Sequence, residues 1–170
     1  MNPREKEYEF CPTCKAELAR KTIDDISRLV CPNCSFIFWN NPKPVASMLL
    51  ENEGKVLLIK RSNEPLKDYW CLPGGYVNYG EEPTDAAIRE AKEETDLDVK
   101  IEGLAGVYMI DNDPRGINID IIYLGKILGG NLKLNEEASE ANYFDPDNLP
   151  NLIAYRHREA IEDGFPPSRE

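Results

Sequence analysis

Blocks of apolar residues along the chain predict several strands and two helices. Four blocks have the length and the β-branched content of strands: Val45–Leu50, Lys55–Arg61, Val99–Ile110 and Ile117–Ile127. A glycine-bearing turn separates the first two, which therefore predict a hairpin, and the third is expected to break at Gly103 and Gly106. The last apolar block, Leu152–Ile161, predicts a C-terminal helix.

The segment Pro83–Thr95 predicts the other helix. Proline suits the first helical turn, where its missing N–H costs nothing. Four residues recur at helical spacing and are expected to face the sheet: Thr84, Ile88, Ala91 and Thr95. Asp96 follows at the position where glycine commonly ends a helix, and aspartate tolerates the left-handed backbone better than most residues.

This helix carries an unusual acidic face. Glu90, Glu93 and Glu94 are spaced i, i+3 and i+4, so their carboxylates leave the same side of the helix. Like charges at that spacing repel by roughly 0.2–0.5 kcal/mol per pair, which a solvated surface or a bound cation can offset. Oxygen ligands without His or Cys suit Mg²⁺ or Mn²⁺. The sequence therefore favours a divalent-metal site over a merely solvated acidic helix.

A glycine pair and an arginine surround the acidic face. Gly74 and Gly75 directly follow a proline, and two glycines allow the backbone to come close to a ligand or a metal. Arg89 adjoins Glu90 in sequence, while Glu81 precedes the helix, and the guanidinium can hold either carboxylate.

Four cysteines near the N-terminus form two C-x₂-C pairs separated by 16 residues: Cys11, Cys14, Cys31 and Cys34. This spacing is typical of a four-thiolate zinc ribbon, and the intervening residues read as a short hairpin. Two disulfides or a redox pair are the alternatives, and a cytoplasmic chain seldom keeps disulfides. We therefore expect structural Zn²⁺. Cys71, the fifth cysteine, is expected to be a small buried residue.

A proline-bearing linker at Asn40–Pro44 divides the chain. We therefore assign residues 1–41 to the zinc ribbon, residues 42–163 to the main domain and residues 164–170 to a C-terminal tail. The aromatic run Phe36–Trp39 is interpreted as packing against the next domain. A base-stacking surface is the alternative, and the neutral charge of the ribbon argues against it.

Composition and charge exclude several functions. No apolar run is long enough to span a membrane and the N-terminus lacks a signal-peptide core, so we expect a cytoplasmic protein. Acidic and basic residues balance in the ribbon, so the net charge of −11 lies in the rest of the chain, and nucleic acid is an improbable partner. The single histidine, His157, makes a Ser-His-Asp triad improbable and is expected on the surface or at a helix cap.

The stretch from Gly75 to Leu97 resembles the signature of the Nudix hydrolase family, Gly-x₅-Glu-x₇-Arg-Glu-U-x-Glu-Glu-x-Gly-U, where U is a bulky aliphatic residue. Every charged position matches, whereas Ala91 is small for U and Asp96 replaces Gly. The resemblance covers roughly residues 42–163. It implies an α/β fold, an α/β/α sandwich around a mixed sheet.

The resemblance also implies roles for single residues. Glu90, Glu93 and Glu94 would bind Mg²⁺ or Mn²⁺ together with the Gly74 carbonyl, and Arg89 and Glu81 would orient these ligands. The general base varies within the family, and the candidates here are Glu90, Glu137 and Glu140. The last two match acidic positions after the signature that often complete the site.

The implied reaction is hydrolysis of the pyrophosphate bond in a nucleoside diphosphate linked to another moiety. The zinc ribbon makes the chain similar to ribbon-bearing ADP-ribose and FAD pyrophosphatases, so these substrates rank first. NADH and oxidised nucleoside triphosphates follow, and a Nudix-like nucleotide sensor is the alternative of another class. Family members are often dimers, so a homodimer is possible.

Overall fold

The computed structural model describes residues 8–164 of the 170-residue chain, so the predicted tail lies outside the described residues except for Gly164. The chain divides into two compact units, and the boundary in the sequence lies between Pro42 and Lys43. Neither described helix is long and apolar enough to cross a membrane.

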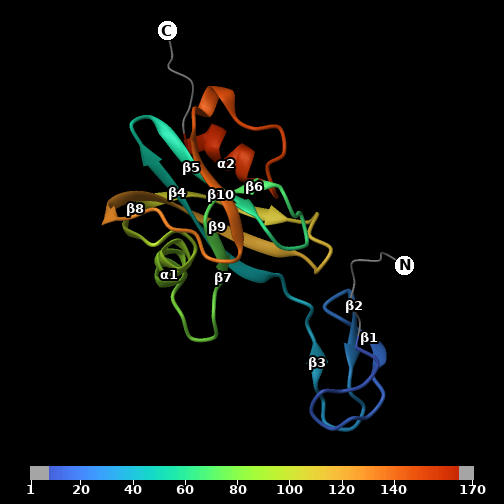
Figure 1. Ribbon diagram of the computed structural model, residues 1–170. Helices are drawn as coiled ribbons and strands as arrows, with labels where there is room; N and C mark the ends of the chain where they lie inside the picture. The colour runs from blue at the N-terminus through green and yellow to red at the C-terminus, as the bar shows by residue number, and fades with distance from the viewer. Residues whose placement is uncertain (1–7, 165–170) are drawn as a thin grey trace. The chain divides into compact units, whose positions relative to one another are not determined.

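The first unit is built on a small antiparallel sheet (Figure 1). Its strands are β1 (Ala19–Ile23), β2 (Ile26–Val30) and β3 (Ile37–Phe38), in the order β1-β2-β3. Asp24 and Asp25 make the turn between β1 and β2 with positive φ angles of 50° and 61°, a conformation that aspartate tolerates. The hairpin expected between the two cysteine pairs is therefore present.

The second unit contains a mixed seven-stranded sheet. Its strands are β4 (Lys43–Asn52), β5 (Lys55–Arg61), β6 (Trp70–Cys71), β7 (Gly74–Tyr76), β8 (Leu97–Ile110), β9 (Asn118–Gly130) and β10 (Ala138–Phe144). The main order is β10-β5-β4-β9-β8, while β6 pairs with β5 and β7 pairs with β4. Only the β4–β9 pair is parallel. The predicted hairpin of β4 and β5 is confirmed.

One helix covers each face of this sheet, because alternate residues of a strand point to opposite faces. Met48 and Leu50 of β4 pack with the alanines of α1 (Pro83–Thr95). Leu49, between them, packs with Ile161 of α2 (His157–Gly164). A short 3₁₀ helix, η1 (Pro146–Asn148), precedes α2. The expected α/β/α architecture is confirmed (Figure 1).

The buried face of α1 differs from the predicted stripe. Thr84 and Ile88 are exposed, whereas the buried residues are Ala86, Ala87, Ala91, Glu94 and Thr95. Three alanines allow the helix to pack closely on the sheet, and this orientation turns Glu94 inward. The helix ends as its sequence indicated, because Asp96 adopts φ 56° and its N–H donates to the Lys92 carbonyl.

Two further predictions were wrong. β8 does not break at Gly103 and Gly106 but continues through both, with register shifts against β9 that keep the pairing. The last helix begins at His157 instead of Leu152. Residues 152–154 pair with Trp70 through two backbone hydrogen bonds of 2.9 and 2.8 Å, and this long-range pairing holds them extended.

Candidate active site

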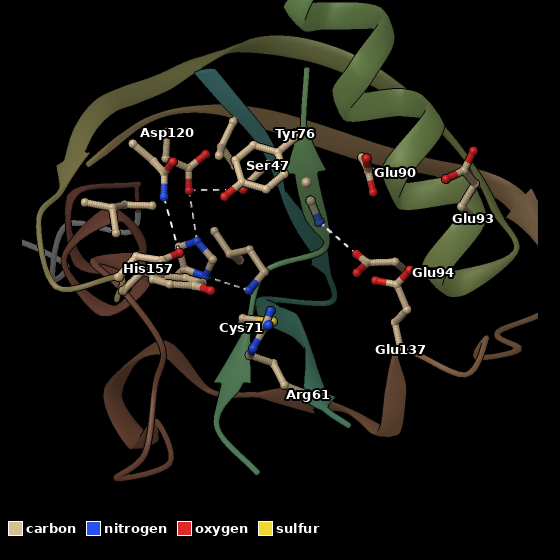
Figure 2. A pocket seen from close by; sticks show the side chains of 18 of the residues that line it. Ser47, Arg61, Cys71, Tyr76, Glu90, Glu93, Glu94, Asp120, Glu137 and His157 are labelled. Carbon is tan, nitrogen blue, oxygen red and sulfur yellow. Dashed lines mark hydrogen bonds and ion pairs between the residues drawn. The ribbon is translucent and has the colours of Figure 1, made fainter. Parts of the chain in front are cut away.

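A cavity of about 310 Å³ lies in the second unit, lined by residues from α1, from strands of the sheet, from the loop before β10 and from the start of α2. Figure 2 shows two groups of polar side chains in it. Glu90, Glu93, Glu94 and Glu137 lie at one end. Ser47, Asp120 and His157 lie at the other.

Glu94 is the most deeply buried of the glutamates, with 7% of its surface exposed. Its Oε2 accepts a hydrogen bond of 2.8 Å from the Gly74 N–H, which joins α1 to the start of β7. Burial raises the pKa of the Glu94 carboxyl to about 8, since this one hydrogen bond does not replace the lost hydration. A cation placed at this carboxyl would restore the charged form.

Arg89 organises the carboxylates around it. Its Nε and NH2 lie 2.7 and 2.9 Å from the two oxygens of Glu81, a bidentate pair that lowers the pKa of Glu81 to about 2. Its NH1 lies 2.7 Å from Glu90 Oε1 and 3.3 Å from Glu93 Oε2. One guanidinium therefore contacts three acidic residues, and the Tyr76 carbonyl accepts another of its hydrogen bonds.

The Glu90 carboxyl packs directly against the backbone of Gly75. A Cβ placed on Gly75 would lie 2.5 Å from Glu90 Cδ, closer than real side-chain contacts. Burial raises the pKa of Glu90, although Arg89 acts in the opposite direction. Glycine at position 75 is thus required by space, and its backbone φ is not in the left-handed region.

The structure separates the two acidic residues expected after the signature. Glu137 lines the cavity beside Glu94 (Figure 2). Glu140 lies on β10, outside the cavity lining, and pairs with Lys60 at 2.9 Å. Five of the other expected site residues line the cavity: Gly74, Arg89, Glu90, Glu93 and Glu94. Glu81 is not in the lining but pairs with Arg89, which is.

The donor set at this end fits a hard divalent cation. It consists of the carboxylates of Glu90, Glu93, Glu94 and Glu137, and Mg²⁺ and Mn²⁺ prefer such oxygen ligands. Among the described residues, the glutamates do not form a group whose oxygens lie close enough to share one ion, whereas the four cysteines do, with their sulfur atoms within 4.8 Å of one another. Glu90 pairs with Arg89 at 2.7 Å.

A buried polar chain at the other end of the cavity was not expected from the sequence. The Leu72 N–H donates to His157 Nδ1 at 2.9 Å, so the ring proton must be on Nε2, which lies 3.0 Å from Asp120 Oδ2. Ser47 Oγ donates to the same oxygen at 3.1 Å. His157 is only 3% exposed, so the surface position was wrong, whereas the alternative of a helix end agrees with its place as the first residue of α2. These residues lie on three elements far apart in sequence, and no local spacing reveals them.

Arg115 and Asp113 form a further ion pair on the cavity wall. Asp113 is 1% exposed and accepts hydrogen bonds from the Arg115 guanidinium at 2.8 and 3.1 Å. Burial alone would raise the pKa of Asp113, but these bonds outweigh it and the pKa is lowered. Arg115 also lies over the Tyr76 ring, 5.6 Å from its centre. The wall thus combines a positive charge with aromatic surface.

The four cysteines of the first unit gather their sulfur atoms. Cys11 Sγ lies 3.5 Å from Cys34 Sγ, and Cys14 Sγ lies 3.4 Å from Cys31 Sγ. These distances exclude disulfides, which require about 2.05 Å, and all five cysteines are free, with Cys71 buried as expected. A tetrahedral zinc with Zn–S bonds of about 2.3 Å places its sulfurs roughly 3.8 Å apart. The cluster therefore has nearly the dimensions of a zinc site.

Residues 41–164 match the NUDIX domain. This chain belongs to the NUDIX family. An ADP-ribose pyrophosphatase of Methanocaldococcus jannaschii is 44% identical over 124 residues, which are 72% of this chain and 73% of that protein. The NAD-capped RNA hydrolase NudC of Chromobacterium violaceum is 29% identical over 155 residues, 89% of this chain and 56% of that protein. The crystal structure of a Nudix hydrolase from Nitrosomonas europaea superposes with a TM-score of 0.79 at 29% identity and covers 91% of this chain and 89% of its own.

Membership confirms the family suggested by the Gly75–Leu97 signature. The protein is a Nudix hydrolase, and enzymes of this family act on small nucleotide substrates with divalent metals. The cavity places most of the signature's acidic residues on one wall, where they can hold such an ion. The opposite wall, with Asp120 and His157, is not part of the signature.

Proposed function

We propose that this Nudix hydrolase cleaves the pyrophosphate bond of a nucleoside diphosphate linked to another moiety, with ADP-ribose as its first substrate. The observation that carries the proposal is one cavity in which Glu90, Glu93, Glu94 and Glu137 face a wall where the charged groups are paired with one another and lie beside Tyr76. One end suits a metal-bound pyrophosphate and the other suits the organic part of the substrate. The similarity to an ADP-ribose pyrophosphatase ranks this substrate above FAD.

The glutamates of α1 would hold Mg²⁺ or Mn²⁺, with the Gly74 carbonyl as a further ligand. Such an ion neutralises pyrophosphate charge and lowers the pKa of a bound water. Glu81 acts at a distance, because its bidentate pair with Arg89 fixes the guanidinium that orients Glu90. Positioning residues of this kind typically change activity 10–100-fold when they are removed.

Glu137 is the preferred general base among the three candidates. It lines the cavity and comes from the loop before β10, not from α1, so it is proposed to act on a water that the glutamates of α1 do not hold. Glu90 is engaged by Arg89. Glu140 is outside the cavity lining and paired with Lys60, so its part in proton transfer ranks last.

The first unit is proposed to be a structural zinc ribbon. Although burial opposes it, hydrogen bonds from the backbone N–H groups of Thr13 and Cys14 lower the pKa of the Cys11 thiol. Similar bonds from Asn33 and Cys34 lower the pKa of Cys31. Although backbone hydrogen bonds oppose it, the neighbouring thiols raise the pKa of Cys14 and Cys34, and a bound metal ion would displace the protons that these two thiols hold.

A substrate panel with product identification tests the function. The purified protein is assayed with Mg²⁺ or Mn²⁺ against ADP-ribose, FAD, NADH and an oxidised nucleoside triphosphate, and Glu93→Gln serves as the inactive comparison. ADP-ribose is expected to give AMP and ribose 5-phosphate. Hydrolysis of NADH alone would instead establish an NADH pyrophosphatase. Binding of these compounds without turnover of any would establish the sensor instead.

A cytoplasmic location and a homodimer remain part of the proposal. β8 ends the sheet in its main strand order and exposes Leu104, Val107 and Met109, which a second copy can cover. Sedimentation of the purified chain tests the dimer.

A further inference from the structure

One oxygen of a buried carboxylate has no partner at the cavity wall opposite the glutamates. Asp120 is 1% exposed and lines the cavity. Its Oδ2 receives hydrogen bonds from Ser47 Oγ and from His157 Nε2, at 3.1 and 3.0 Å. Its Oδ1 is buried and has no hydrogen-bond partner among residues 8–164. A buried acceptor without a partner is costly and rare, so this one requires an explanation.

The carboxylate cannot turn to relieve this. Rotation would exchange the two oxygens and leave the same arrangement, because both donors bind at one oxygen position. Those donors are themselves fixed. His157 is held by the Leu72 N–H at Nδ1 and stands at the first position of α2, while Ser47 lies within β4. Among residues 8–164, no group donates to Oδ1, although the carboxylate to which it belongs lines the cavity.

The residues beside Asp120 in the sheet offer apolar and aromatic surface to an organic group. Asp120 pairs in register with Val45 of β4, and Val45 pairs with Tyr76 of β7, so the three residues lie side by side across the sheet. Leu72 and Ile110 add apolar surface to the same cavity. Figure 2 shows this wall at the end away from the glutamates. A carboxylate in such surroundings repels phosphate and attracts an N–H or O–H donor.

We propose that Asp120 Oδ1 accepts a hydrogen bond from an N–H or O–H donor in the nucleoside part of the substrate and thereby determines specificity. The proposal rests on the proposed function for the class of substrate. A nucleotide contains two kinds of group that could be this donor: an amino group of the base and a hydroxyl of the sugar. Ser47 and His157 are positioning residues, since they hold the other oxygen.

Equilibrium binding separates the two sources. AMP, IMP and ribose 5-phosphate are titrated with Mg²⁺ present, because none of them contains a pyrophosphate bond to hydrolyse. In Asp120→Asn, the donors from Ser47 and His157 keep the amide carbonyl at the Oδ2 position, so the amide NH₂ takes the place of Oδ1. An acceptor becomes a donor with almost no change of shape. Asp98→Asn, at an exposed position on β8, is the matched control.

The expected result is a loss of AMP affinity of about tenfold or more in Asp120→Asn, the usual effect of losing a hydrogen bond to a charged group. If the donor is the base amine, the variant should bind IMP as well as or better than wild type does, because IMP carries a carbonyl there that can accept from the new NH₂. If the donor is a sugar hydroxyl, Asp120→Asn should lower the affinity for AMP, for IMP and for ribose 5-phosphate alike. Unchanged affinities for all three compounds, or no binding of any of them to the wild type, would overturn the proposal.

A measurement on the wild-type protein covers the case in which Asp120→Asn does not fold. His157 is the only histidine in the chain, so ¹⁵N-histidine labelling gives the two nitrogen signals of one imidazole ring, of which the Nε2 signal reports on Asp120. A saturating amount of the compound that carries the donor is expected to shift the Nε2 resonance. A new hydrogen bond at Oδ1 withdraws charge from the carboxylate and so weakens the bond between Oδ2 and Nε2. Binding without any shift would contradict the proposal.

The two proposals can fail separately. Hydrolysis of ADP-ribose with the same substrate preference in wild type and Asp120→Asn would reject the role of Asp120 and leave the proposed function standing. If the protein hydrolyses no dinucleotide but its binding of AMP depends on Asp120, the proposed function is rejected and the role of Asp120 stands.

Discussion

Arg89 Nε lies 2.7 Å from Glu81 Oε1, and the same guanidinium reaches Glu90 Oε1 at 2.7 Å through its NH1. The residue that precedes the helix is therefore connected to a proposed metal ligand through one planar group. Arg89 can hold both carboxylates only because its donors are fixed in a fork, a geometry that lysine lacks.

Arg89→Lys is expected to lower kcat about 10–100-fold with a smaller change in the free energy of unfolding, since lysine keeps the charge but loses the bidentate pair. Steady-state kinetics and denaturant unfolding measure the two effects. Lys100→Arg, on the exposed face of β8, serves as control. Equal activity in Arg89→Lys and wild type would contradict the proposed orienting role.

The same pair predicts an acid limit for stability. Arg89 lowers the pKa of Glu81 in the folded protein from its ordinary 4.5 to about 2. The folded state therefore binds fewer protons between these values, so the stabilisation is complete above about pH 4.5 and is lost as the pH falls toward 2. Glu81→Gln should be less stable than wild type at pH 6, and the difference should shrink below pH 4. A constant difference across this range would show that Glu81 is not held this way.

Gly75→Ala tests whether the Glu90 carboxyl must lie against bare backbone. The new Cβ would meet Glu90 Cδ at 2.5 Å and push the carboxylate out of its position. A displacement of about 1 Å at a catalytic group can cost about 10²-fold in rate. Gly103→Ala is the matched control, because its Cβ would meet only Leu124 Cδ1 at 3.9 Å. Activity should fall in the first variant alone.

Glu94 predicts the opposite pH dependence from Glu81. Burial raises its pKa from 4.5 to about 8 in the metal-free protein. Between these values the folded state binds more protons than the unfolded state, so stability without metal should fall as the pH rises from 5 to 8. In Glu94→Gln this part of the slope should vanish. Denaturant unfolding in the presence of a chelator at several pH values measures it, and identical slopes in both proteins would rule it out.

Glu137→Gln and Glu140→Gln compare two acidic residues that sequence alone could not separate. Glu137 lines the cavity, whereas Glu140 pairs with Lys60 at the surface. The loss of a general base typically costs 10²–10⁴-fold, so the first substitution should lower kcat by at least about 10² and the second by far less. The pH–rate profile of Glu137→Gln should also lose its acidic limb. A larger effect at Glu140 would reverse the assignment.

Local sequence patterns predicted the parts of this protein that depend on near neighbours. The strand Lys55–Arg61, the helix Pro83–Thr95 and the cysteine pairs follow from periodicity and spacing. The wall formed by Ser47, Asp120 and His157 does not, because only the register of β4 against β9 and the docking of α2 bring them together. The start of α2 was missed for a related reason: Trp70, more than 80 residues away in sequence, holds residues 152–154 extended.

The cysteine cluster predicts about one zinc ion per chain and a first unit that depends on it. Cys11→Ser with Cys34→Ser should abolish zinc binding and unfold β1–β3, because a small module with few buried residues relies on the roughly 10–16 kcal/mol that zinc contributes in small peptides. The second unit has its own core and should stay folded, which hydrogen exchange can show segment by segment. Cys71→Ala, outside the cluster, should keep its zinc by elemental analysis. A native protein without zinc, or protected β1–β3 amides in the double variant, would reject the structural site.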